Sequence, residues 1–149
     1  KANLPIEFLP VIMFILAGLM AFSTGTSWGS FGILLPIAGK IMLDASPEML
    51  LPALAAVLAG AVFGDHCSPI SDTTILSSTG AGCNHIDHVT TQLPYALISA
   101  SISTAGYLVL GLTGSIWIGF ISVIVILAIL FTVWTVMSKK NESHLERIV

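Results

Sequence analysis

Apolar residues fall into four groups along the chain, and polar stretches separate these groups. The third group, 93–112, and the fourth, 115–137, each reach about the 20 residues that a helix needs to cross the hydrocarbon core of a bilayer. Only the short sequence Gly-Leu-Thr-Gly at 111–114 connects them, so we expect an antiparallel helical hairpin. The pattern predicts an all-α polytopic membrane protein.

The first two groups, 8–42 and 49–81, have a different pattern. Their leading apolar stretches, 8–22 and 49–63, are each 15 residues long and run into polar sequence before apolar residues resume. Irregular backbone at membrane depth is tolerated only beside protein or a watery cavity, and transporters place such interruptions at their substrate site. We expect each group to be a discontinuous helix or a re-entrant hairpin. The two groups also show a weak similarity at a separation of roughly 40 residues, as one half of an inverted-repeat transporter would.

Composition supports a membrane location. The chain is 55% hydrophobic and 9% charged, whereas soluble domains carry roughly 25% charged residues. No basic patch suggests a nucleic-acid partner, and the expected surroundings are the lipid bilayer. Basic residues follow the last span, so the positive-inside bias predicts that 139–149 form a cytoplasmic tail. Counting back, the loop at 85–88 is cytoplasmic and the turn at 113–114 is external.

The chain starts Lys1-Ala2-Asn3, without an initiator methionine or a signal-peptide pattern. We interpret residues 1–138 as the carboxy-terminal transmembrane region of a longer transporter. A site between two halves would then need residues from the missing amino-terminal half. We expect the isolated piece to pair with that half or to self-associate into a homo-oligomer.

Two aspartates and a proline stand in the second break, at 64–74. A carboxylate inside a bilayer is costly and usually marks an ion pathway or a proton relay. No lysine or arginine occurs from 41 through 138, so a proton, a cation or an external partner must neutralise Asp65 and Asp72. Pro69 supplies no N–H, which predicts a free carbonyl at Asp65, and it favours extended backbone at Ser68.

These features predict an all-oxygen site for a hard cation, with Na⁺ and H⁺ competing at the two aspartates. Hydroxyl ligands in the second break are Ser68, Ser71 and Thr73. Asp72 also suits the N-cap of a helix that begins near Thr73. The positive end of that helix would favour an ionised Asp72 or an anionic substrate group.

The first break, at 23–30, carries hydroxyls but no charge. Thr24 and Thr26 are candidate ligands that complete the ion shell, and close helix packing by small residues is the alternative. Glycines are the candidate points of helix interruption: Gly25, Gly29 and Gly64.

Histidines offer further chemistry near the second break. His66 neighbours Asp65, and histidine is the side chain suited to pH sensing, so the sequence leaves two roles open: tuning of the pH profile, or packing by hydrogen bonding. His85 and His88 flank Asp87 in a predicted polar loop, where a metal site is the weaker interpretation. No cofactor is expected.

The sequence resembles the NhaC-type family of sodium/proton antiporters. The resemblance rests on Gly-Thr-Ser-Trp-Gly at 25–29 and on Gly-Asp-His-Cys-Ser-Pro-Ile-Ser-Asp-Thr-Thr at 64–74. It extends through 77–89 and through Gln-Leu-Pro-Tyr at 92–95. The resemblance implies broken helices in inverted repeats and Na⁺/H⁺ exchange across a bacterial plasma membrane. It also implies relatives that exchange malate for lactate.

Three functions remain to be weighed. The leading hypothesis is a Na⁺/H⁺ antiporter, which is a transporter and not an enzyme. The second is a Na⁺- or H⁺-coupled organic-anion antiporter, which would need an anion-binding group that residues 41–138 lack. The third is an intramembrane metal-dependent enzyme built on Asp65, His66 and Cys67 with the 85/88 histidine pair. It lacks a helical histidine pair at metal-ligand spacing.

Overall fold

The structure, a computed structural model, describes residues 5–145, with side chains as far as residue 138. These residues form helices and turns without a β-strand. Two short 3-10 helices, η1 (Ile6–Phe8) and η2 (Pro47–Met49), lead into longer helices. The α-helices are α1 (Leu9–Thr24), α2 (Ser27–Ala45), α3 (Leu50–Cys67), α4 (Asp72–Ala81), α5 (His85–Thr113) and α6 (Ile116–Leu145).

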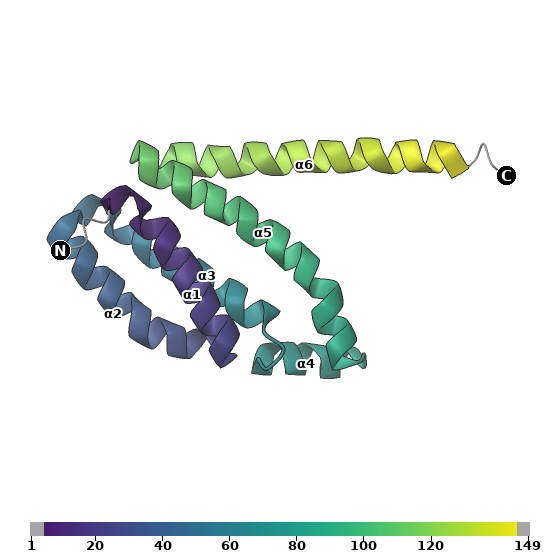
Figure 1. Cartoon of the computed structure of the whole chain (residues 1–149), viewed down its shortest axis with the longest axis horizontal. Helices are drawn as coiled ribbons and strands as arrows, with labels where there is room; N and C mark the ends of the chain where they lie inside the picture. Colours follow the sequence, from purple (N-terminus) through teal and green to yellow (C-terminus); the bar gives the residue numbers. More distant parts are fainter. Residues whose placement is uncertain (1–4, 146–149) are drawn as a thin grey trace.

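Helices α1, α2 and α3 pack together as a compact group, in which α1 and α2 form a hairpin and α3 lies against both (Figure 1). Short α4 lies at the end of this group where α1 and α3 finish. Helix α5 then returns past α1 and α3, and α6 packs mainly on α5 before it extends away. The arrangement brings both helix breaks to the same end of the molecule.

Glycines allow α1 and α3 to approach closely. A side chain at Gly60 would overlap the Phe14 carbonyl, and one at Gly64 would overlap the Gly18 carbonyl. Fully buried alanines surround this crossing: Ala17, Ala21, Ala53, Ala56 and Ala61. Small residues let helix backbones pack tightly in membranes, where no hydrophobic force draws apolar helices together. This crossing holds the second break against the first.

Within the described residues, four helical stretches are long and apolar enough to cross a membrane: Ile6–Thr24, Pro47–Cys67, His85–Thr113 and Ile116–Ser138. The prediction of an all-α polytopic membrane protein is therefore confirmed. The group at 8–42 adopts the hairpin alternative, because α2 folds back beside α1. In the group at 49–81, α4 follows α3 after an unwound stretch.

The loop predicted at 85–88 is wrong, and two helices extend beyond the predicted apolar spans. Residues 85–88 are the first turn of α5 and not a loop, because the Asn84 side chain accepts hydrogen bonds from the N–H groups of Ile86 and Asp87. Helix α5 also continues through Pro94. Helix α6 runs into the predicted tail as far as Leu145, and 146–149 lie outside the described residues.

The glycine crossing gives the first prediction. Gly60→Ala should lower the melting temperature of the complete protein in detergent, because overpacking costs about 1–3 kcal/mol. Gly32→Ala in α2 is the control, since a side chain there meets no atom within 4 Å and alanine favours a helix. Equal melting temperatures for the two variants would contradict the packing argument.

Candidate functional site

The second break lies between α3 and α4, at residues 68–71. Pro69 has no N–H to continue α3, and the preceding Ser68 adopts extended backbone with φ −72° and ψ 128°. Helix α4 then starts with Ser71 as its N-cap, since the Ser71 hydroxyl accepts the Thr73 N–H at 3.2 Å. The expected extended Ser68 is confirmed.

The expected free carbonyl at Asp65 is wrong. The Ser68 N–H donates to the Asp65 carbonyl at 3.2 Å, closing a tighter turn at the end of α3. Nearby carbonyls also have partners. Gln92 Nε2 donates to the His66 carbonyl at 3.0 Å, and His85 Nε2 donates to the Pro69 carbonyl at 2.7 Å. These donors share the three carbonyl oxygens, so none of the three is a free ligand of the kind that the break predicts.

The Asp65 carboxylate is the centre of the site. The residue is only 7% exposed and sits in the last turn of α3. The Ser71 hydroxyl donates to Asp65 Oδ1 at 2.6 Å, and the Ser27 hydroxyl donates to Oδ2 at 3.2 Å. A carboxylate has about four lone-pair positions, so these two bonds leave it able to accept a proton or to contact a cation.

The first break supplies the second hydroxyl. Gly25 ends α1 in the left-handed conformation with φ +71°, and the extended Thr26 (φ −150°) directs the chain into α2. Ser27 is therefore the first residue of α2, and it faces the end of α3. The break is two residues long, shorter than the expected 23–30.

The two breaks touch each other. A side chain at Gly25 would lie 2.8 Å from the Ile70 carbonyl, and the buried Ser68 hydroxyl donates to the Phe22 carbonyl at 2.8 Å. Residues more than 40 positions apart in sequence are thus joined around Asp65. The two helix breaks therefore form a single site around Asp65.

The second aspartate lies apart from this cluster. Asp72 is exposed, and it is the first residue of α4 instead of its N-cap. Its Oδ1 accepts the Thr73 N–H at 2.9 Å. Thr73, in contrast, joins the cluster, with its Oγ1 2.7 Å from Ser71 Oγ. The structure brings Asp65, Ser71 and Thr73 together and leaves the Asp72 side chain outward.

The first-break candidates are placed differently from expectation. The Thr24 hydroxyl donates back to the Met20 carbonyl at 2.9 Å, and half-buried Thr26 contributes its carbonyl to the Ser30 hydroxyl. Gly29 and Gly64 are wrong as points of interruption. Gly29 lies in the first turn of α2, and Gly64 lies inside α3 at its crossing with α1.

Sequence reasoning missed two residues. Ser27 is one of several hydroxyls in the predicted break at 23–30, and nothing in the sequence distinguishes it from the others. His85 braces the second break, since its Nε2 bonds to the Pro69 carbonyl while its Nδ1 lies 3.1 Å from Ser78 Oγ. No feature of the sequence indicated that pairing across 16 positions.

A polar pocket of about 470 Å³ adjoins the site between the end of α3, α4 and the start of α5. Residues with hydroxyl, amide and imidazole groups line it. The lining residues are His66, Thr73, Thr74, Ser77, His88, Thr91, Gln92 and Tyr95. Thr73 belongs both to this pocket and to the Asp65 cluster.

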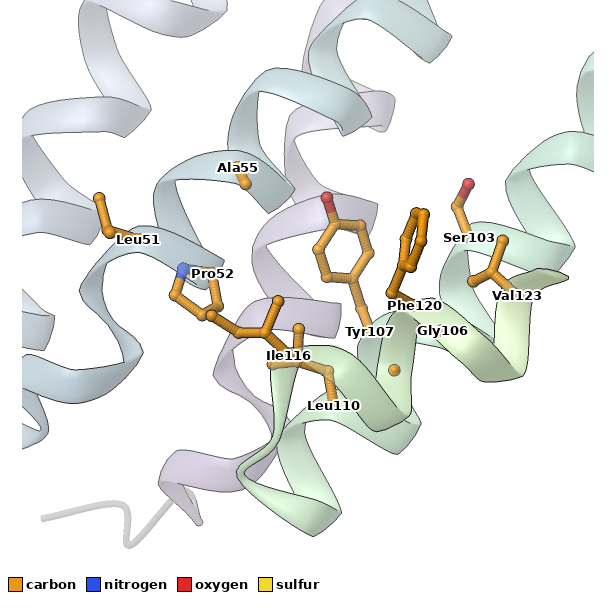
Figure 2. Close-up of a pocket in the computed structure, with 11 residues that line it drawn as sticks. Leu51, Pro52, Ala55, Ser103, Gly106, Tyr107, Leu110, Ile116, Phe120 and Val123 are labelled. Atoms are coloured by element: carbon orange, nitrogen blue, oxygen red, sulfur yellow. The ribbon is translucent and has the colours of Figure 1, made fainter.

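A separate apolar cavity of about 370 Å³ lies between α3, α5 and α6, near the opposite end of α3 (Figure 2). Its walls are aliphatic and aromatic, and Ser103 and Tyr107 supply its side-chain hydroxyls. Leu51 and Pro52 mark its position at the start of α3, far along the helix from Asp65. Without a carboxylate, this cavity does not suit a cation.

No cation of the protein's own lies close to Asp65 in the helices that form its site. Residues 41–138 contain neither lysine nor arginine. Lys40 of α2 lies more than three helical turns beyond Ser27, roughly 20 Å along the helix. Within residues 5–138, every buried side-chain oxygen and nitrogen has a hydrogen-bond partner. Hydroxyl dipoles thus surround the carboxylate without neutralising it.

Comparison with known proteins gives the family. Residues 1–112 match the Na⁺/H⁺ antiporter family, and the chain belongs to that family. An uncharacterised protein of Haemophilus influenzae is 63% identical over 134 residues, which cover 89% of this chain and 26% of that protein. No solved structure matches the chain.

Two further relatives carry functional names. An uncharacterised Na⁺/H⁺ antiporter of Haemophilus influenzae is 41% identical over 71% of this chain and 22% of its own length. The malate-2H⁺/Na⁺-lactate antiporter of Bacillus subtilis is 37% identical over 67% of this chain and 22% of its length. The chain therefore spans about a quarter of the curated relatives that it matches.

The contact between the breaks gives a prediction with a matched control. Gly25→Ala and Gly82→Ala both place alanine in left-handed backbone, which costs about 1–2 kcal/mol. Only at Gly25 would the new methyl press on the Ile70 carbonyl; nothing lies within 4 Å at Gly82. We expect Gly25→Ala alone to impair Na⁺ binding, measured by equilibrium ²²Na⁺ binding to the purified complete protein. Equal binding by both variants would show that the contact is dispensable.

Proposed function

We propose that this chain is part of a secondary antiporter that exchanges Na⁺ for H⁺ across a bacterial plasma membrane. The observation that carries the proposal is the buried Asp65 carboxylate, which Ser27 and Ser71 hold where two helix breaks meet. Membership of the Na⁺/H⁺ antiporter family supports the choice of ions.

Competition at Asp65 supplies the exchange mechanism. Burying an unneutralised carboxylate is costly, so either a proton or Na⁺ accompanies it. The two hydroxyl oxygens and the carboxylate form part of an oxygen shell of the kind that hard cations prefer. Because one carboxylate accepts either ion, arrival of one releases the other, and alternating access to the two membrane faces turns this competition into exchange.

Asp72 has a secondary place in this proposal. Its exposed carboxylate stands in the first turn of α4, next in sequence to Ser71. A carboxylate there raises the local concentration of cations by long-range attraction. It therefore assists Na⁺ capture, while Asp65 holds the ion. Thr24 and Thr26 lie at the turn between α1 and α2 and shape the same end of the site.

We further propose that the site is completed by the amino-terminal part of a longer protein. The match to only a quarter of each relative supports this, as does the family's inverted-repeat arrangement that the sequence resemblance implies. Broken-helix transporters build their sites between repeats near the bilayer midplane. Self-association into a homo-oligomer is the alternative way to cover the breaks.

A coupled organic-anion antiporter is the second candidate. The similarity to the malate-2H⁺/Na⁺-lactate antiporter favours it, since the same cation site could drive an organic substrate. Transport assays that add malate or lactate to Na⁺-loaded vesicles separate the two: Na⁺/H⁺ exchange without any organic anion supports the first proposal.

Substitution of the aspartates tests the roles. Asp65→Asn should reduce Na⁺-driven H⁺ flux in proteoliposomes of the complete protein to the level of empty vesicles. Asp72→Asn should retain exchange with a raised KM for Na⁺. Asp44→Asn, exposed near the end of α2, serves as the control. Full exchange by Asp65→Asn would overturn the proposed site.

Sidedness gives an independent prediction. We propose that the end of α6 is cytoplasmic and that the turn after Thr113 is external. In a background with Cys67→Ser and Cys83→Ser, Ser143→Cys and Thr113→Cys should react with an impermeant thiol reagent from opposite sides. Reaction from the same side would contradict a complete crossing of the membrane by α6.

A further inference from the structure

A row of hydroxyl groups links the polar pocket to Asp65. Thr73 lines the pocket, and its Oγ1 lies 2.7 Å from Ser71 Oγ, which lies 2.6 Å from Asp65 Oδ1. Both distances are those of good hydroxyl hydrogen bonds. Asp65 itself is buried, so the row connects a buried group with an open polar space.

The direction of each bond follows from the number of protons. A serine hydroxyl has a single hydrogen, and the hydrogen of Ser71 goes to the Asp65 carboxylate, which only accepts. Thr73 must therefore donate to Ser71. The remaining lone pairs of Thr73 Oγ1 are free to accept a hydrogen bond from the pocket side. Both hydroxyls thus point their hydrogens toward Asp65.

We infer that Thr73 and Ser71 form a proton relay that delivers H⁺ from the polar pocket to Asp65. This inference rests on the proposed exchange function and adds to it the route of one of the two ions. Thr73 has no role as a cation ligand in this scheme, and it acts through Ser71.

The transfer conserves protons at each step. A hydrated proton in the pocket forms a bond to Thr73 Oγ1, and Thr73 passes its own hydrogen to Ser71 Oγ. Ser71 passes its hydrogen to Asp65 Oδ1, and Na⁺ leaves as the carboxylate becomes neutral. One proton enters the row and one bonds to Asp65, so each hydroxyl keeps a single hydrogen. Rotation of the two hydroxyls then restores their original direction.

The walls of the pocket suit this use. Its lining includes side chains with which water can form hydrogen bonds, namely Ser77, Gln92 and Tyr95 and the imidazoles of His66 and His88. The pocket is wide enough for several water molecules, each of which takes up about 30 Å³ in the liquid. Protons can therefore reach Thr73 through water, while the Ser27 side of Asp65 lies toward α2.

Thr73→Val is the decisive variant, because it removes the hydroxyl and keeps the shape. It also preserves the backbone N–H that Ser71 accepts, so the N-cap of α4 remains. We expect Na⁺-driven H⁺ flux in proteoliposomes of the complete protein to fall roughly 100-fold, the lower end of the range for a positioned proton-transfer group. Equilibrium ²²Na⁺ binding should stay unchanged. Thr73→Ser should restore the flux, and Thr79→Val, which removes an exposed hydroxyl on the same helix, should match the wild type.

The outcomes separate the relay from the exchange proposal. If Asp65→Asn is inactive while Thr73→Val exchanges at the wild-type rate, the relay is wrong and the Asp65 site stands. If Thr73→Val loses Na⁺ binding in proportion to flux, or Thr73→Ser fails to restore the flux, Thr73 supports the cation site and the relay is again wrong. Full exchange by Asp65→Asn would contradict both the relay and the proposed exchange site at Asp65.

Discussion

The cost of placing a carboxylate among apolar helices governs the rest of this structure. Asp65 is buried, and no lysine or arginine occurs between 41 and 138. Two hydroxyls stabilise the carboxylate through hydrogen bonds, yet dipoles alone do not supply a balancing charge. A carboxylate that is neutralised only by a mobile ion carries either a bound proton or a bound Na⁺. This constraint is the physical basis of the exchange proposed here.

Helix packing determines where that carboxylate lies. Glycines at the crossing of α1 and α3 bring the two backbones into contact, which aligns the ends of both helices. The turn at Gly25 then meets the unwound residues 68–71, and Ser27 reaches Asp65 from the neighbouring hairpin. Without this close crossing, each break would expose backbone polar groups to lipid, where each unsatisfied group costs several kcal/mol. Packing and chemistry thus depend on the same small residues.

Sequence patterns predicted the features that arise from local chemistry. Apolar length predicted α5 and α6 as spans, and the steric effect of Pro69 predicted the extended Ser68. The patterns failed where distant segments decide the outcome. Gly64 serves helix packing and is not a break, and one of the two hydroxyl partners of Asp65 is Ser27, 38 positions away. The loop predicted at 85–88 failed for a different reason. These polar residues form the first turn of α5 because the Asn84 side chain caps the helix.

The geometry assigns different surroundings to the two oxygens of Asp65. Oδ2 faces Ser27 of α2 through a long bond of 3.2 Å, whereas Oδ1 accepts a short bond of 2.6 Å from the hydroxyl row of α4. The long bond from Ser27 is the easier one for a cation to break or to share. The short bonds from Thr73 through Ser71 to Asp65 are the better path for a proton. If Na⁺ approaches Oδ2 and H⁺ approaches Oδ1, the two ions compete for the single negative charge of Asp65 but reach it by different paths. Movement of α2 relative to α3 would then alter the cation side and leave the relay intact, since the relay lies wholly within residues 65–73.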